Sequence, residues 1–247
     1  MRMTVLGCSG GYPTAENPCS GYLLEQDGAR IWLDAGTGTF AALQRVADYT
    51  RLEALVLSHI HPDHCLDFYP FYIARRFHPE ELSKLPVYGP PGIKEVLAGL
   101  MVGEGIEKIE RWFDFRAVDE GDEVEVGGLR LTFARMSHTI HTLAVRAEGA
   151  GSLTYSADTG PEADLAGFAR GSDFLLCEAT YQEGRVGAPV HLSARQAGDT
   201  ARRAGVRQLA LTHHWPTFDP EVSLSEGIEA AGEVRVHLAR PGVTFEV

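Results

Sequence analysis

Residues 55–66 read LVLSHIHPDHCL, an apolar run that ends at Ser58 and leads directly into a cluster of polar side chains. The apolar run is typical of a buried strand, because it is short and rich in branched aliphatic residues. Imidazoles and a carboxylate, the side chains that bind divalent cations, follow where the strand ends. The candidate donors are His59, His61, Asp63 and His64.

The spacing within this loop indicates two metal ions rather than one. His59 and His61 are two residues apart, and in an extended segment such side chains point to the same side, so one cation can bind both. Pro62 favours a turn, after which Asp63 and His64 point elsewhere and can bind a second cation. A solvated, histidine-rich loop with chance spacing is the alternative interpretation.

The composition predicts an ordinary globular protein. The chain has 247 residues, 44% of them hydrophobic, and we expect a single domain that spans residues 1–247. The net charge of -12 disfavours a polyanionic partner such as tRNA, so a small-molecule substrate is the better expectation. No apolar run approaches the roughly 20 residues of a transmembrane helix, and membrane association is not expected.

The cysteines indicate a reducing compartment. The four cysteines are far apart in the sequence, without a Cys-x-x-Cys pair. No secretory signal precedes the first strand. A disulfide framework is therefore not expected, and the cytoplasm is the expected location.

Strands, hairpins and helices follow one another twice along the chain. Asp27-Gly28 and Gly127-Gly128 are hairpin signals between alternating apolar segments. A helix is expected at 93–101, and residues 103–111 read as a loop or irregular turn. The second half repeats the order of the first, which predicts an α/β sandwich of two mixed sheets with helices outside.

Further metal-ligand candidates follow other predicted strands. His138 comes after the strand at 129–134, Asp158 after 153–156, and His213 after 208–212. Because strand ends converge at one edge of such a sandwich, we expect the site there. Ser193 and Gln196 form a capping-box signature for a helix at 194–204.

Several motifs together carry a resemblance to a known family. The most specific are His-x-His-x-Asp-His at 59–64, SADTG at 156–160 and LTH at 211–213. Further matches are LGCSGGYPT at 6–14, LDAGTG at 33–38, and Glu-Ala-Thr at 178–180 ahead of His191. The chain resembles the metallo-β-lactamase superfamily and, within it, the ribonuclease Z-like branch.

The resemblance implies the αββα fold and a dinuclear ligand set. One metal would be held by His59, His61 and His138, and the other by Asp63, His64 and His213. Asp158 would bridge the two ions, because a carboxylate can span cations about 3.5–4 Å apart. Zinc is the expected ion, with Mn²⁺ or Fe²⁺ as alternatives. Asp34 either orients the histidine loop or caps a helix.

The resemblance also implies hydrolysis of an ester by a metal-activated hydroxide. Only one short hairpin separates His138 from Asp158, where tRNA-processing relatives insert an arm that grips tRNA. We therefore expect a small phosphodiester, such as a cyclic nucleotide, as the substrate. Ribonuclease Z-type tRNA 3′ processing and lactone or thioester hydrolysis are the alternatives; a di-iron oxygen or nitric oxide reductase and a non-catalytic metal sensor are less consistent with the ligand set.

Two residues are candidates for proton transfer. Asp63 can steer the proton of the nucleophile. The family has a histidine before Glu-Ala-Thr, but this chain has Cys177, whose thiol is a poor acid. His191 is therefore the candidate general acid, with a structural histidine at a helix entry as the alternative.

Other polar residues are left open by the sequence. His141 and His214 each lie within three residues of a candidate ligand, and a direct role for either is undecided. Arg75 and Arg76 either meet a substrate phosphate or lie on a solvated helix face. The sequence also allows a homodimer.

Overall fold

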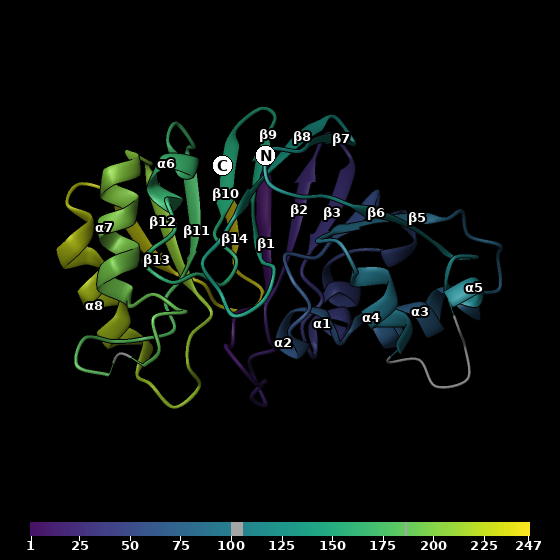
Figure 1. The fold of residues 1–247 in the computed structure, drawn as a ribbon, viewed down its shortest axis with the longest axis horizontal. Helices are drawn as coiled ribbons and strands as arrows, with labels where there is room; N and C mark the ends of the chain where they lie inside the picture. The colour runs from purple at the N-terminus through teal and green to yellow at the C-terminus, as the bar shows by residue number, and fades with distance from the viewer. Residues whose placement is uncertain (100–105, 186) are drawn as a thin grey trace.

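The computed structural model describes residues 1–99, 106–185 and 187–247. Two seven-stranded sheets face each other, and helices cover the outer face of each sheet (Figure 1). The first half of the chain builds most of one sheet and the second half builds the other. The expected αββα sandwich of two mixed sheets is confirmed.

The first sheet is antiparallel at one side and parallel at the other. The strands β1, β2 and β3 pair antiparallel, and the crossovers that follow make the remaining pairs parallel up to β6. In sheet order, the strands are β14 (Thr244–Glu246), β1 (Arg2–Gly7), β2 (Gly21–Gln26), β3 (Ala29–Leu33), β4 (Ala54–Val56), β5 (Leu85–Gly89) and β6 (Phe113–Ala117).

The second sheet has the same mixed plan. Its antiparallel meander runs from β7 to β10, and its parallel part runs from β10 to β13. In sheet order, the strands are β13 (Arg235–Leu238), β12 (Gln208–Thr212), β11 (Phe174–Glu178), β10 (Ser152–Tyr155), β9 (Leu143–Glu148), β8 (Leu129–Arg135) and β7 (Glu123–Val126).

The helices of each half of the chain cover the outer face of the sheet that this half builds. Beside the first sheet lie α1 (Thr39–Val46), the 3₁₀ helix η1 (Tyr49–Arg51), α2 (Pro62–Cys65), α3 (Phe68–Arg76), α4 (Ile93–Gly99) and α5 (Ile106–Ile109). Beside the second sheet lie α6 (Leu165–Ala169), α7 (Ala194–Ala204) and α8 (Pro220–Ala231). Ser193 and Gln196 complete the expected capping box of α7.

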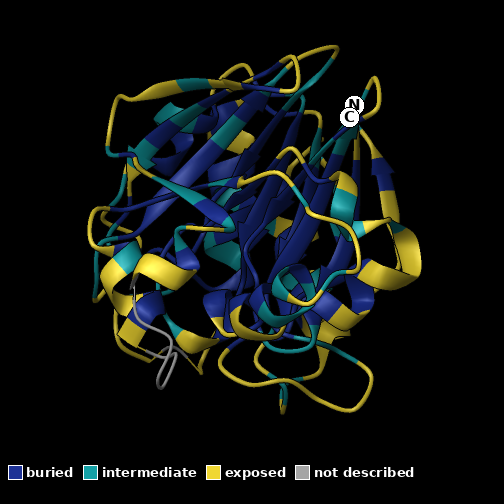
Figure 2. Ribbon diagram, turned by 90° about the vertical axis from the view of Figure 1, so that its right-hand side faces the viewer, coloured by how far each residue is buried: buried dark blue, intermediate teal, exposed yellow. Residues whose placement is uncertain are grey.

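The core has three layers of apolar side chains. One cluster fills the space between the sheets, and two others lie between each sheet and its helices. Figure 2 shows buried strands at the centre and exposed loops and helix faces around them. The hairpin turns have the positive φ angles that these sequences predict, 51° and 91° at Asp27 and Gly28, and 56° and 78° at Gly127 and Gly128. This rigid double layer fixes where the strand ends meet.

Two sequence expectations differ from the structure. Within the expected loop at 103–111, residues 106–109 form the one-turn helix α5, while residues 103–105 lie outside the described part of the chain. The helix expected at 93–101 agrees with α4 as far as Gly99, and its last two residues lie outside the described part. Arg75 is neither at a phosphate nor solvated: only 2% of it is exposed, and its guanidinium packs over Phe71 and Phe113.

Among the described helices, none combines the length and the apolar character that a membrane crossing requires.

Candidate metal centre

The seven predicted donors converge at one end of the sandwich. The loop after β4 brings His59 and His61, and α2 brings Asp63 and His64. Three more donors follow strands of the second sheet: His138 after β8, Asp158 after β10 and His213 after β12.

The donors divide into the two groups that the family resemblance implied. The ligand atoms of His59, His61, His138 and Asp158 lie within 4.8 Å of one another, and so do those of Asp63, His64 and His213. Asp158 faces both groups, because its Oδ2 is 3.7 Å from His138 Nε2 while its Oδ1 is 3.3 Å from His64 Nε2. The geometry thus suits a carboxylate placed between two cations.

In His64 and His138, a hydrogen bond from Nδ1 to a group outside the site leaves Nε2 facing the site. His64 Nδ1 donates to Asp34 Oδ2 over 2.7 Å, and His138 Nδ1 donates to the Val190 carbonyl over 2.9 Å. An oxygen that can only accept requires a proton on Nδ1, so in the neutral ring Nε2 carries the lone pair. These lone pairs face the interior of the site.

Two further rings are held through hydroxyl groups. The Ser58 hydroxyl donates to Asp34, so it accepts from His59 Nδ1 at 3.0 Å. The Thr180 hydroxyl donates to Glu178 and accepts from His213 Nδ1 at 2.8 Å. These supporting hydroxyls were not predicted, because a serine or threonine beside a strand is ordinary.

Nitrogen atoms of the described histidines crowd together at the centre of the site. His61 Nδ1 lies 3.2 Å from His59 Nε2 and 3.1 Å from His138 Nε2, so several lone pairs meet at short range. Among the described side chains, His64 Nε2 and Asp158 Oδ1 are buried without a hydrogen-bond partner. Buried polar atoms are normally satisfied, and cations bound between them would satisfy these. The residues therefore fit a pair of divalent metals.

Asp34 occupies the centre of the supporting network. Its buried carboxylate accepts hydrogen bonds from the Ser58 amide at 2.7 Å, from His64 at 2.7 Å and from the Tyr155 hydroxyl at 2.8 Å. Helix α1 is instead preceded by Gly38, without a side-chain cap. Of the two interpretations of Asp34, the contacts favour the orienting role and contradict the capping role.

Neighbouring charges shift the pKa values of the candidate ligands, so protons and metal ions compete for the same histidine nitrogens. Burial lowers the pKa of His64, but the carboxylates of Asp158, Asp63 and Asp34 together raise it well above the usual value. Burial lowers the pKa of His59 well below the usual value, and its histidine neighbours lower it further. A metal must displace the proton on His64, so binding depends on pH.

Backbone strain concentrates at the same edge. Three non-glycine residues there have positive φ angles: 55° at Asp34, 52° at Ala157 and 55° at His213. Such conformations cost energy and persist where the surrounding structure enforces them, as at ligand sites. Each follows a strand and turns a ligand or its supporter toward the site, a feature that sequence patterns do not reveal.

The glycine-rich loop after β1 contacts the ligands directly. The Gly11 amide donates to Asp63 Oδ2 over 2.7 Å, and the same oxygen lies 3.2 Å from His213 Nε2. At Gly10, a Cβ atom would lie only 2.9 Å from His213 Nδ1. The motif at 6–14 therefore needs its glycines because its backbone passes against metal ligands.

His191 lies beside the donors but is held by a different partner. Its Nδ1 is 3.0 Å from Glu178 Oε1, and its ring stacks on that of His213 with centroids 5.4 Å apart. Burial would lower the pKa of His191, but the hydrogen bond and charge of Glu178, together with Asp158, raise it to about 9. The ring can therefore hold a proton next to the candidate ligands.

The Glu178 carboxylate is itself fixed by the surrounding loop. It accepts hydrogen bonds from the Thr159 amide at 2.6 Å, the Thr180 hydroxyl at 2.7 Å and the Leu192 amide at 3.2 Å. A role for Glu178 was not predicted, although the Glu-Ala-Thr motif at 178–180 was the signal that pointed to it. Cys177, next to it, is fully buried, and burial raises the pKa of its thiol well above the usual value.

The two undecided histidines lie outside the ligand cluster. His141 Nε2 pairs with Asp119 Oδ1 at 2.9 Å on a partly exposed loop. His214 lines a neighbouring cavity of about 280 Å³, and neither of its ring nitrogens has a hydrogen-bond partner among the described residues. Burial, with the neighbouring His213 charge, lowers the pKa of His214 to about 4.

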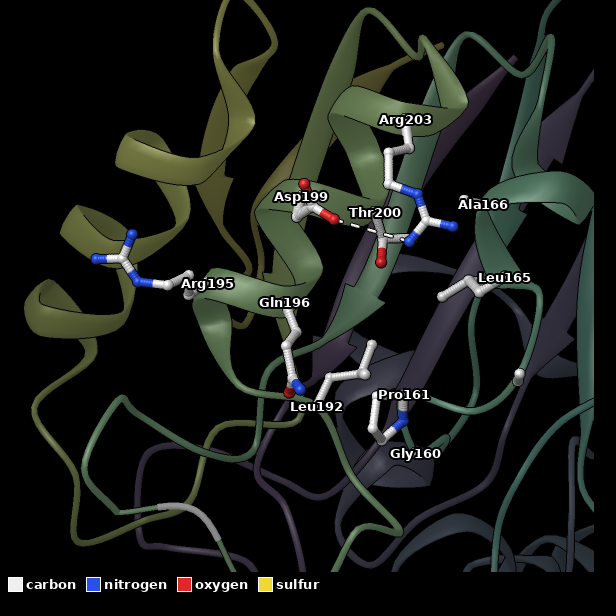
Figure 3. Close-up of a pocket in the computed structure, with 11 residues that line it drawn as sticks. Gly160, Pro161, Leu165, Ala166, Leu192, Arg195, Gln196, Asp199, Thr200 and Arg203 are labelled. Carbon is white, nitrogen blue, oxygen red and sulfur yellow. Dashed lines mark ion pairs between the residues drawn. The ribbon is translucent and has the colours of Figure 1, made fainter.

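A cavity of about 270 Å³ opens over the metal donors. It is lined by Gly11, His61, Asp63, His138, Thr139, Asp158, Val190, His191, His213 and Trp215. A larger cavity of about 370 Å³ lies between α6 and α7 (Figure 3). None of its described lining residues is a metal donor, and Arg203 there points toward Asp199, so the chemistry belongs to the smaller cavity.

Comparison with known proteins agrees with this geometry. The sequence profile of a family described as "Beta-lactamase superfamily domain" matches residues 15–214, a stretch that includes all seven donors. The chain belongs to the metallo-β-lactamase superfamily. The expected membership, on the ribonuclease Z-like side of the superfamily, is confirmed by the relatives that match.

Three relatives within the superfamily match over nearly their whole length. An uncharacterized protein of Mycobacterium tuberculosis, Rv1339, is 37% identical over 254 residues, covering 100% of this chain and 92% of the relative. Ribonuclease Z of Kineococcus radiotolerans is 30% identical, covering 96% and 92%. The crystal structure of YhfI from Bacillus subtilis, a metallo-β-lactamase fold protein, superposes with a TM-score of 0.89 at 26% identity, covering 99% of each chain.

These findings establish the class of activity. The Bacillus subtilis protein is named a probable metallo-hydrolase and is 28% identical over the full length of both chains. The same fold here carries a convergent His/Asp cluster with inward lone pairs. The chain is a metallo-hydrolase of the metallo-β-lactamase superfamily.

Proposed function

We propose that the chain hydrolyses a small phosphodiester, such as a cyclic nucleotide or a related ester, with two divalent metal ions, preferably zinc. The ligands would be the two groups joined by Asp158. The observation that carries the proposal is the placement of the His191 proton donor directly beside those ligands. When bound, the cations would supply an activated water and neutralise the charge of the phosphoryl oxygens.

The protein side chains would divide the proton transfers between them. Asp63 Oδ2, held by the Gly11 amide, faces the ligand cluster and can accept a proton from the attacking water. The water oxygen forms a bond to phosphorus while a phosphorus–oxygen bond breaks. His191, charged through Glu178, gives its proton to the departing oxygen, and the products are an alcohol and a phosphomonoester.

The walls of the cavity favour a substrate with little negative charge. None of the described residues that line it is a lysine or arginine, and the whole chain carries a net charge of -12. A phosphodiester has a single negative charge, which the metals alone can balance. A polyanion would need additional cationic contacts along its length.

Ribonuclease Z-type tRNA processing is the second candidate, supported by the 30% identity to the Kineococcus radiotolerans enzyme. tRNA processing would also cleave a phosphorus–oxygen bond of a phosphodiester. Between His138 and Asp158, however, only the β9–β10 hairpin is present, with its turn at residues 149–151. That short hairpin supports a small substrate over tRNA.

The test is a substrate panel with purified protein and varied metals. It compares nucleoside cyclic phosphates, aryl phosphodiesters, lactones, thioesters and precursor tRNA. We expect the highest kcat/KM on a small phosphodiester. Efficient tRNA 3′ processing at physiological salt, or a lactone or thioester as the best substrate, would reject the proposal.

A further inference from the structure

Trp215 lines the metal cavity, and the ring of a second exposed aromatic residue, Tyr12, contacts it. Tyr12 is 45% exposed and Trp215 is 37% exposed, although most large apolar side chains of the chain are buried. Their rings meet edge to face, with centroids 6.0 Å apart and an interplanar angle of 87°. Exposed aromatic surface of this kind beside a cavity is typical of a ligand contact.

The position of the Trp215 ring is tied to the metal ligands. A Cβ atom at Gly11 would lie 3.1 Å from Trp215 Cζ3, so the indole packs against the bare backbone of that glycine. The same Gly11 donates its amide to Asp63. Trp215 also follows His213 by two residues. The indole is therefore held at a fixed place relative to the reacting centre.

Trp215 borders two cavities at once. It lines the metal cavity of about 270 Å³ and the neighbouring cavity of about 280 Å³, where Phe218 and Asn17 are further lining residues. The metal cavity alone is smaller than the roughly 300–1,000 Å³ of typical ligand sites. A substrate larger than the ester group itself therefore extends along the indole.

We infer that Trp215, supported by Tyr12, is the platform on which the nucleobase of a nucleoside phosphodiester packs while its phosphate lies over the metals. This inference rests on the proposed function and narrows it to esters that carry a planar base. A base is planar and has a π face, so it suits the aromatic face of Trp215, and Arg240 in the lining of the neighbouring cavity can pack against a base as well. The assignment makes Trp215 a specificity-determining residue.

The first experiment compares matched substrates that differ only in the base. One is a purine nucleoside 3′,5′-cyclic phosphate, and the other is 1-O-methyl ribose 3′,5′-cyclic phosphate. Trp215→Leu keeps apolar bulk but removes the aromatic face, so kcat/KM should fall about 10- to 100-fold on the first substrate and stay within about twofold on the second. Trp215→Phe should restore most of the loss, and Trp112→Leu, the same change elsewhere, should leave the ratio unchanged.

The second experiment measures binding without turnover. Calorimetric titration of metal-loaded protein compares a purine nucleoside 5′-monophosphate with ribose 5-phosphate. We expect the wild-type chain to bind the nucleotide at least about 10-fold more tightly, and Trp215→Leu to abolish this difference. If neither cyclic phosphate is hydrolysed but this preference is found, the proposed function fails while the base platform stands.

Two outcomes would overturn the inference. Equal binding of nucleotide and ribose phosphate by the wild-type chain would show that the base makes no contact. Equal losses of kcat/KM on both cyclic phosphates in Trp215→Leu, with metal content unchanged, would show that the indole supports the site rather than the base.

Discussion

Glu178 Oε1 lies 3.0 Å from His191 Nδ1, so the carboxylate fixes a ring that lines the metal cavity. The same carboxylate also accepts hydrogen bonds from the amides of Thr159 and Leu192 and from the hydroxyl of Thr180. A histidine that merely caps a helix entry would not need such a fixed anionic partner. The pair therefore supports the role of His191 in proton donation, and leaving-group chemistry can test that role.

His191→Ala should discriminate between leaving groups. A nitrophenolate departs without a proton, whereas an alkoxide needs one, and a positioned acid contributes about 10²- to 10⁴-fold. We expect kcat on an alkyl phosphodiester to fall at least about 10²-fold, with little change on an aryl one. Steady-state kinetics on the two esters measure this difference.

His141→Ala is the matched control, because His141 pairs with Asp119 outside the described lining of the metal cavity. It should leave both rates unchanged. Equal losses on both esters in His191→Ala would instead assign His191 to support of the metals or the fold.

Metal-replete protein should contain two ions per chain. Seven donors form two groups, and Asp158 of the first group also faces His64 and His213 of the second, so removing either His59 or Asp158 should lower the stoichiometry. Elemental analysis of the wild type, His59→Ala and Asp158→Ala measures it, with His141→Ala as a variant that keeps two ions. A wild-type value that stays at one under excess metal would contradict the dinuclear assignment.

Gly36→Ala should damage the centre although Gly36 is not a ligand. A Cβ atom there would lie 2.1 Å from the Asp63 carbonyl oxygen, so the ligand helix α2 or the loop after β3 must move. We expect a loss of stability of about 1–3 kcal/mol and weaker metal binding. Denaturant unfolding and metal titration measure the two effects.

Gly99→Ala is the control for Gly36→Ala, because the same substitution there meets no steric clash. Gly99 lies in α4, and a Cβ atom there would meet no described atom within 4 Å. Alanine favours helix over glycine, so stability should rise by about 0.5–1 kcal/mol. A similar loss at both positions would mean that the contact with Asp63 is not the cause.

His214 should make the fold sensitive to acid. Burial lowers its pKa to about 4, whereas the unfolded histidine titrates near pH 6.5. Between these values the unfolded chain binds more protons, so the free energy of unfolding falls as the pH falls from about 6.5 to 4, by roughly 1–3 kcal/mol. Urea unfolding of the metal-free protein across this range should show a shallower pH slope in His214→Asn, and an unchanged slope would contradict the prediction.

Much of the fold could be predicted because its determinants are local. The hairpin turns at Asp27 and Gly127, the capping box at Ser193 and the donors at strand ends are short-range patterns with a direct physical cause. The short helix α5 was not predicted, because a single turn has little periodicity to detect. Burial of Arg75 was missed for a different reason: its aromatic partner Phe113 is distant in sequence.

The supporting parts of the site were predicted less completely than the donors. The positive φ angles at Asp34, Ala157 and His213 occur at residues other than glycine, and no local sequence pattern specifies them. The role of Glu178 depends on its contact with His191 across the loop, thirteen residues away. Contacts between residues that are distant in sequence can be recognised only in the three-dimensional structure.

Strand β14 pairs with β1 in the first sheet, although the chain around it builds the second. The register joins Met3 to Phe245, so the outer edge of β1 is covered by residues that leave the ribosome last among those described. An uncovered strand edge is a template for association with other chains. During synthesis, the edge of β1 therefore stays unpaired until β14 has been made. A nascent chain that has been made only as far as His213, just after β12, contains all seven metal donors, but the unpaired edge of β1 can still associate with other polypeptides.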